Sequence, residues 1–134
     1  MASNSDGSIT IMFALPEQIT GNNAGTAYTI KVGWSLMNTK EVDSPAADVA
    51  VTMVEFAFGT SSGVVWIPAT VANAIVLSQD VVVPKNSTKK GAKVITVTAP
   101  NAPGGSTGVV LAVRTTTIFS PASNSPMTGQ KTVE

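Results

Sequence analysis

The segment at residues 28–37 reads YTIKVGWSLM and carries a large apolar side chain at every second position. These side chains alternate with small or polar residues, and they are Ile30, Val32, Trp34 and Leu36. Successive side chains of a β-strand point to opposite faces, so a period of two places all four on the same face. The segment therefore predicts a strand with one buried face.

Similar short runs recur along the chain between segments rich in glycine, proline and asparagine. Together with residues 28–37 they predict about eight strands, the others being 8–15, 48–58, 64–67, 75–77, 80–83, 93–99 and 109–119. Val, Ile and Thr, which favour pleated sheets, are abundant, and no amphipathic helix stands out. This pattern predicts an all-β protein, an antiparallel two-sheet sandwich of jelly-roll-like form.

The runs also predict local features. The apolar pattern is unclear at 49–53, which indicates a β-bulge or a stretch covered on both faces. The glycine-bounded segment 59–63 has the length of a hairpin loop. The side chains expected to line the core are Ile30, Val32, Trp34, Leu36, Val54, Phe56, Phe58, Ile95, Val97, Leu111 and Val113.

The two ends of the chain differ in composition from its strand-rich part. Residues 8–119 are expected to form one sandwich domain, preceded by a flexible N-terminal arm at 1–7. Residues 120–134 are rich in Ser, Pro and Asn, and their only larger apolar residues are Met127 and Val133. Such a segment buries too little apolar surface to offset its ordering entropy. We therefore expect an extended C-terminal assembly arm, mobile in the free protein, whose two apolar residues contact a neighbouring subunit.

Composition excludes several classes of function. The 134 residues include no histidine and no cysteine, which excludes Ser-His-Asp and Cys-His catalysis and the usual zinc and iron sites. Eight basic and eight acidic residues give a formal net charge of zero, which argues against nucleic acid as a partner. The sequence shows no signal-peptide pattern and no apolar run long enough to cross a membrane. We expect no enzymatic activity, no cofactor and no small-molecule substrate.

Two motifs could suggest chemistry. Stretches at 59–63 and 104–108 match G-x-S-x-G, but a nucleophile elbow needs a helix after the serine and a base such as histidine. Both precede predicted strands and are interpreted as turns. Glu41, Asp43 and Asp48 could supply oxygen ligands to calcium, and this possibility stays open although no EF-hand pattern surrounds them.

Other side chains suggest contacts with partners. Four lysines lie within nine residues, namely Lys85, Lys89, Lys90 and Lys93. No aromatic residue is interleaved for base stacking, so the cluster is interpreted as a solvated loop or as an electrostatic contact with a protein. Tyr28, Trp34 and Trp66 could form a platform for sugars, but Trp34 shares the apolar face of its strand. Core packing is the favoured interpretation for Trp34.

A small all-β domain without histidine or cysteine, low in charge and ending in a Ser/Pro/Asn-rich segment, resembles the structural proteins of virus particles. More narrowly, it resembles the decoration or cement proteins on the heads of tailed bacteriophages. The resemblance implies a non-enzymatic protein of the capsid surface, made in the host cytoplasm, that oligomerises with copies of itself and stabilises a shell of major capsid protein. Two alternatives are a single jelly-roll capsid subunit and a carbohydrate-binding or adhesin module.

Overall fold

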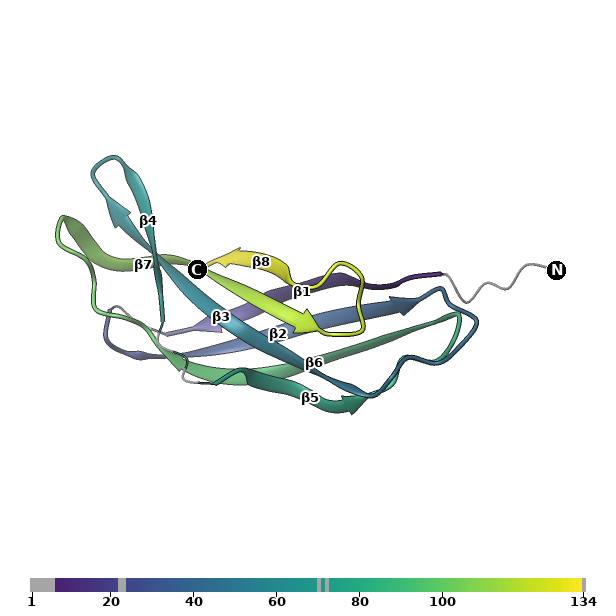
Figure 1. Cartoon of the computed structure of the whole chain (residues 1–134). Coiled ribbons are helices and arrows are strands. Elements are labelled where there is room, and N and C mark those ends of the chain that lie inside the picture. Colours follow the sequence, from purple (N-terminus) through teal and green to yellow (C-terminus); the bar gives the residue numbers. More distant parts are fainter. Residues whose placement is uncertain (1–6, 22–23, 70, 72, 134) are drawn as a thin grey trace.

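The computed structural model describes residues 7–21, 24–69, 71 and 73–133, and these residues form eight strands and no helix (Figure 1). In chain order the strands are β1 (Ile9–Thr20), β2 (Ala27–Asn38), β3 (Ala47–Thr60), β4 (Gly63–Pro68), β5 (Ile75–Val81), β6 (Ser87–Thr98), β7 (Ser106–Phe119) and β8 (Met127–Thr132). All their pairings are antiparallel. The prediction of an all-β, two-sheet sandwich is confirmed.

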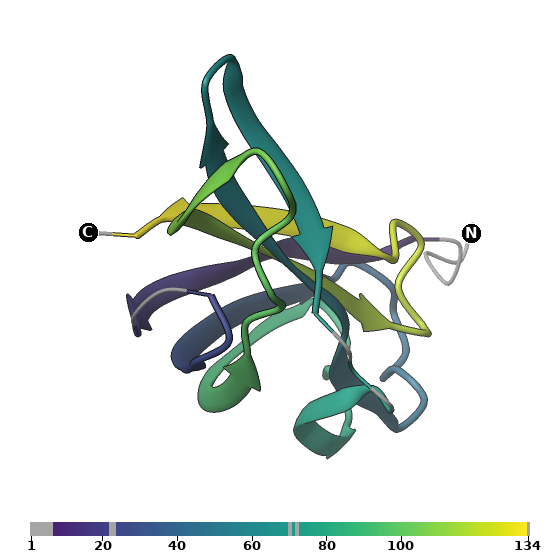
Figure 2. The same cartoon turned by 90° about the vertical axis from the view of Figure 1, so that its left-hand side faces the viewer.

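The strands divide into two sheets that face each other across the core (Figures 1 and 2). One sheet has the order β1-β2-β6 and the other the order β4-β3-β7-β8, with β5 also paired to β3. Because β7 occupies one edge of β3, β4 and β5 share its other edge, at 55–60 and 47–51 respectively. The orders β1-β2-β6 and β3-β7-β8 correspond to strands A-B-E and C-F-G of immunoglobulin-type sandwiches, whereas β5 differs from strand D in that it pairs with β3.

Within this two-sheet sandwich, the strand order differs from that of a jelly roll. A jelly roll winds the first strands of a chain against the last, whereas here β1 pairs with β2 and β3 pairs with β4. The reason is the short connections, which join strands that are neighbours in sequence as hairpins. The prediction of a hairpin at 59–63 is confirmed, with Thr60 opposite Gly63.

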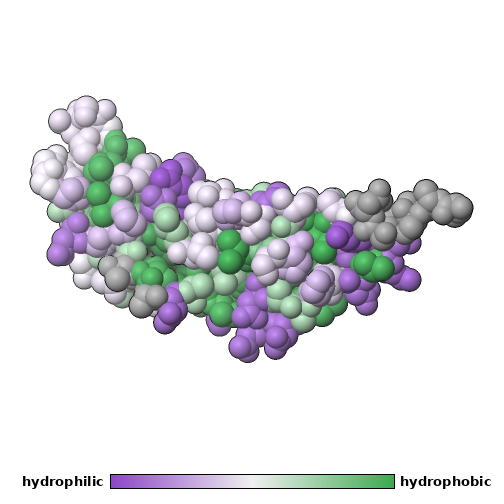
Figure 3. Space-filling view, in the orientation of Figure 1, coloured by the Kyte–Doolittle hydropathy of each residue, from purple (hydrophilic) through white to green (hydrophobic). Residues whose placement is uncertain are grey.

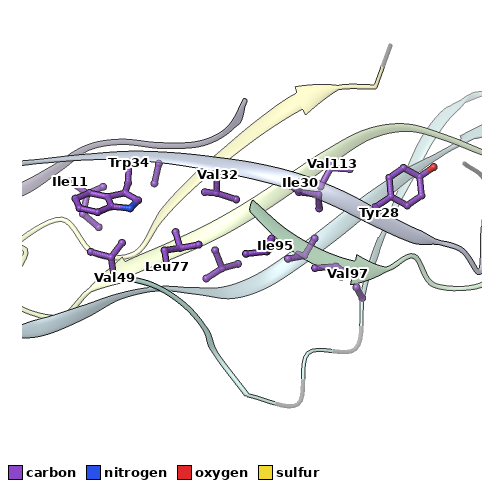
Figure 4. Packing of buried hydrophobic residues seen from close by; sticks show 14 of the residues in the cluster. Ile11, Tyr28, Ile30, Val32, Trp34, Val49, Leu77, Ile95, Val97 and Val113 are labelled. Carbon is purple, nitrogen blue, oxygen red and sulfur yellow. The ribbon is translucent and has the colours of Figure 1, made fainter. Parts of the chain in front are cut away.

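The alternation in residues 28–37 is realised on β2. β2 pairs with β6 without interruption, and its inward side chains lie in a row between the sheets (Figure 4). The ring of Tyr28 meets the ring of Phe56 edge to face, with centroids 5.2 Å apart, so the two sheets touch through these aromatic residues. The predicted core residues are all buried, with Leu111 as the exception.

Leu111 is 39% exposed because β7 contains a β-bulge at this residue. Ala57 lies opposite Ala112 and Phe58 lies opposite Val110, so Leu111 has no partner position on β3. The extra residue shifts the alternation by one position. Val110 consequently faces the core and Leu111 faces outward.

Other boundaries also differ from the sequence-based expectations. The irregularity predicted at 49–53 is confirmed, since the register between β3 and β7 shifts between Val51 and Met53. β1 continues through Pro16 to Thr20. The run predicted as a separate strand at 80–83 instead contributes the last residues of β5, which ends at Val81.

The interpretation of residues 120–134 as an arm outside the domain is wrong for the described residues 120–133. Residues 127–132 form β8, which pairs with β7 from Thr117/Met127 to Ala112/Thr132 (Figure 1). Met127 and Val133 pack against the core of their own domain. Pairing with β7 gives the backbone N–H and C=O groups of residues 127–132 hydrogen-bond partners. This pairing orders a segment whose few apolar side chains could not order it alone. Of the predicted N-terminal arm, residues 1–6 lie outside the described part of the chain.

Candidate interaction surfaces

Both G-x-S-x-G stretches are turns, as predicted. Residues 59–63 close the β3–β4 hairpin, and 104–108 lead into β7. Gly105 and Gly108 adopt φ values of 85° and 79°, a left-handed region that glycine enters without steric cost. Ser61 leads into β4 and Ser106 begins β7, so no helix follows either serine and neither lies in a nucleophile elbow.

The acidic residues that could have bound calcium instead support the backbone. Asp43 Oδ1 accepts a hydrogen bond from Lys85 N at 3.0 Å, and Asp48 Oδ1 accepts one from Asp80 N at 3.0 Å. Across the described ranges, no group of three acidic, histidine or cysteine side chains could hold a metal ion. These two carboxylates hold the end of β5 and the connection that follows it.

The four lysines share an edge rather than a binding site. Lys85 precedes β6, while Lys89, Lys90 and Lys93 lie on β6, the outermost described strand of the three-stranded sheet. The interpretation of this segment as a loop is therefore wrong. Lys90 lies opposite Ser35 on one face, whereas Lys89 lies opposite Leu36 on the other. Lysine on an edge strand opposes pairing with a further strand.

The aromatic residues do not form a sugar platform. Tyr28 and Trp34 are buried in the core, and only Trp66 lies on the outer face of the five-stranded sheet, opposite Ala57. The Arg114 guanidinium lies 4.1 Å from the centre of the Trp66 ring. Arg114 Nε in turn donates to Glu55 Oε1 at 2.9 Å. One ring face of Trp66 is thus already covered by a cation, and Glu55 is engaged as its counter-ion.

An open groove of about 370 Å³ lies where the ends of β1 and β8 diverge. Its lining consists of Glu17, Gln18, Ile19, Thr20, Lys131 and Thr132. It contains a single carboxylate, whereas glycoside hydrolysis needs two on opposite sides of the bond. The groove therefore lacks the pair of carboxylates that this reaction needs.

Four larger apolar side chains lie on the outer face of the three-stranded sheet, which also carries Lys31 and Lys90. The register places Phe13 and Leu15 of β1, Met37 of β2 and Val94 of β6 on this face. Leu15 is 40% exposed, Met37 36% and Val94 54%. We name these four residues the apolar outer face. Solvent-facing sides of antiparallel sheets are usually polar, so such a face indicates a contact surface.

Three segments without charged residues meet at one end of the sandwich. The sequence contains no Asp, Glu, Lys or Arg at 18–30, 56–79 or 94–113. The fold brings parts of these segments together, since Thr60 pairs with Ser106 and Ala24 N donates to Gly108 O at 3.2 Å. We define the uncharged end as the described residues of 18–30, 56–68 and 94–113. The β3–β4 hairpin projects from it (Figure 1).

Apolar side chains are exposed on the uncharged end. Val64 is 52% exposed and Val109 43%, and hydrophobic atoms gather over the projecting hairpin and the nearby start of β7 (Figure 3). This surface was not among the sequence-based predictions. The three long uncharged segments were a signal that could have found it, because the cores of protein interfaces are depleted in charge.

Comparisons with known proteins yield no relative. No family model, no curated protein and no solved structure matches the chain. In the described part of the chain, no helix is long and apolar enough to cross a membrane.

Proposed function

We propose that the protein is a non-enzymatic structural component of a virus particle, a decoration or cement protein that binds and stabilises a shell of major capsid protein. The apolar outer face is the observation that carries this proposal. Its side chains lie on the three-stranded sheet, where a partner could cover them without displacing any other strand. Covering exposed apolar area is the main driving force of protein association. That the partner is a virus particle is inferred from the resemblance of the chain, in composition and size, to capsid proteins.

A binding role also fits the polar groups that could have carried chemistry. Asp43 and Asp48 hold backbone groups, and Glu55 holds Arg114. Of the serines in the two G-x-S-x-G stretches, Ser61 lies in the turn of the β3–β4 hairpin and Ser106 begins β7. These side chains stabilise the domain itself, which fits a protein that acts through surface contacts rather than through a reaction site.

The other two candidate functions receive less support. A shell-forming jelly-roll subunit conflicts with the observed strand order. A carbohydrate-binding module would present exposed aromatic rings, whereas Tyr28 and Trp34 are buried and Arg114 covers Trp66. We therefore treat sugar binding as an outcome of the test below.

The test mixes the purified chain with bacteriophage heads stripped of their decoration proteins and measures occupancy by electron microscopy and co-sedimentation. We expect the double variant Met37→Gln/Val94→Gln to bind at least about tenfold more weakly, which corresponds to about 1.4 kcal/mol. The matched control is Thr20→Gln/Thr96→Gln, a pair of exposed residues on the same sheet face. Binding to a glycan and to no head would favour the adhesin alternative.

A further inference from the structure

Five described strands lie at sheet edges, β1 and β6 in one sheet and β4, β5 and β8 in the other, and of these β4 and β6 differ most in charge. β6 has twelve residues and carries Lys89, Lys90 and Lys93. β4 reads GVVWIP and carries no charged residue. Natural proteins protect exposed edges with lysine, proline or cover. The edge of β4 is protected only by the short length of the strand and by Pro68 at its end.

The free edge of β4 is also accessible. The β3–β4 hairpin stands away from the rest of the sandwich in both views (Figures 1 and 2). β5 pairs with the opposite half of β3, at 47–51, and so leaves the edge of β4 uncovered. A strand could therefore add to β4 without displacing a described strand of the domain.

We propose that two copies of this chain associate by antiparallel pairing of β4 with β4, which joins their five-stranded sheets into one. The proposal goes beyond shell binding, because it involves copies of this chain alone. A two-fold axis brings identical edges together, so charges of one sign on the edge would lie close to like charges of the other copy. Pairing of β6 with itself would bring lysines together, whereas pairing of β4 brings no charges together.

The residues of β4 suit one particular register. Val64 and Trp66 share the outer face, since they lie opposite Gly59 and Ala57 of β3. A two-fold axis at Val65 puts Val64 of one copy opposite Trp66 of the other on that face, and it puts Val65 opposite Val65. Cross-strand pairs of aromatic and β-branched residues stabilise antiparallel sheets. This register also leaves Pro68, which has no N–H to donate, outside the pairing.

The test measures the mass of the full chain by sedimentation equilibrium over a range of concentrations. We expect a monomer–dimer equilibrium whose dissociation constant changes less than about twofold between low and about 1 M salt, since no charges meet. Val64→Lys should weaken the dimer at least tenfold. Val109→Lys is the matched control, because Val109 is similarly exposed on the uncharged end but lies on β7, and it should leave the dissociation constant unchanged.

A second measurement tests the register. The chain has no cysteine, so Val65→Cys introduces a single thiol beside the proposed axis. Mild oxidation should link most of this variant as covalent dimers, whereas Leu111→Cys, on the outer face away from the edge, should remain uncrosslinked. A monomer at all concentrations overturns the proposal. A dimer that Val64→Lys leaves unchanged and Val65→Cys does not crosslink also overturns it, because the copies would then meet through another surface.

Discussion

The two lateral sides of the sandwich are built in different ways. On the side of β1 and β8, the chain covers its own strand edge. The Asn124 side chain accepts from Ile11 N at 2.7 Å and donates to Ile11 O at 2.8 Å, and so takes the place of a neighbouring strand. Ser123 N donates to Ile9 O at 2.6 Å. Gly129 of β8 packs so closely on Leu15 of β1 that a Cβ there would collide with it.

On the opposite side, the edges of β6 and of β4 remain open. β6 carries lysines, and only Lys93 reaches across, where its Nζ donates to Val76 O at 3.3 Å. Covering an edge buries apolar area and pairs backbone groups, whereas charge on an edge only discourages further pairing. We therefore expect substitutions on the closed side to change the stability of the domain and substitutions on the open side to change association.

Deletion of residues 120–134 should have the largest effect. It removes β8 and the cover that Asn124 gives to β1, so we expect the free energy of unfolding to fall by more than about 4 kcal/mol. Urea denaturation measures the change. Gln130→Ala is the control, since this side chain is exposed on the same strand and should cost less than about 0.5 kcal/mol. A truncated chain as stable as the full one would show that the closed side does not depend on β8.

The core between the two sides should be almost as sensitive. Phe56→Ala leaves a cavity beside Tyr28 and should cost about 3 to 5 kcal/mol. Leu111→Ala removes a side chain that the bulge turns outward, and should cost less than about 1 kcal/mol. Thermal and urea unfolding of both variants measure the difference. Equal costs would contradict the placement of the bulge in β7.

Asn124→Ala tests the cover on β1 alone. The substitution leaves both backbone groups of Ile11 without their partner, so we expect a loss of about 1 to 2 kcal/mol. Amide hydrogen exchange at Ile11 should accelerate, while exchange in β6 should not change. An effect spread evenly over both sheets would argue that Asn124 supports the fold in general and not this edge.

A smaller effect is expected inside the core at Tyr28, the only tyrosine of the chain. Its hydroxyl is buried without a hydrogen-bond partner among the described residues, so Tyr28→Phe should leave stability unchanged or raise it by up to about 1 kcal/mol. Burial raises the pKa of Tyr28, so above about pH 10 the unfolded chain ionises first and the natural protein loses stability as pH rises. Urea unfolding from pH 9 to 11 should show no such loss in the Phe variant.

Replacing the four lysines of residues 85–93 by Gln should change stability least, by less than about 0.5 kcal/mol, because the lysines are exposed. The variant should instead self-associate more readily, which light scattering measures, because β6 loses its charge. If these lysines contact the shell, occupancy on heads should also fall, and in the natural protein it should weaken as salt rises. Unchanged scattering and occupancy would mean that the lysines are only solvated.

The regular strands were predictable because their pattern is local. In residues 28–37 the apolar side chains alternate with a period of two, which identifies the buried face, and turn-forming residues on both sides mark the ends of the strand. Two errors have one physical origin. The bulge that turns Leu111 outward depends on its pairing with β3, and β8 exists because β7 offers a free edge to a segment with few apolar residues.

The candidate surfaces divide in the same way. The missing histidines and cysteines and the uncharged segments are properties of the sequence, and they determined which chemistry is absent and where charge is lacking. Only the tertiary structure decided that the lysines line an edge, that Asn124 covers β1 and that β4 stands open. Side-chain alternation follows from neighbouring residues, whereas strand edges and contact surfaces arise from pairings between residues far apart in the chain.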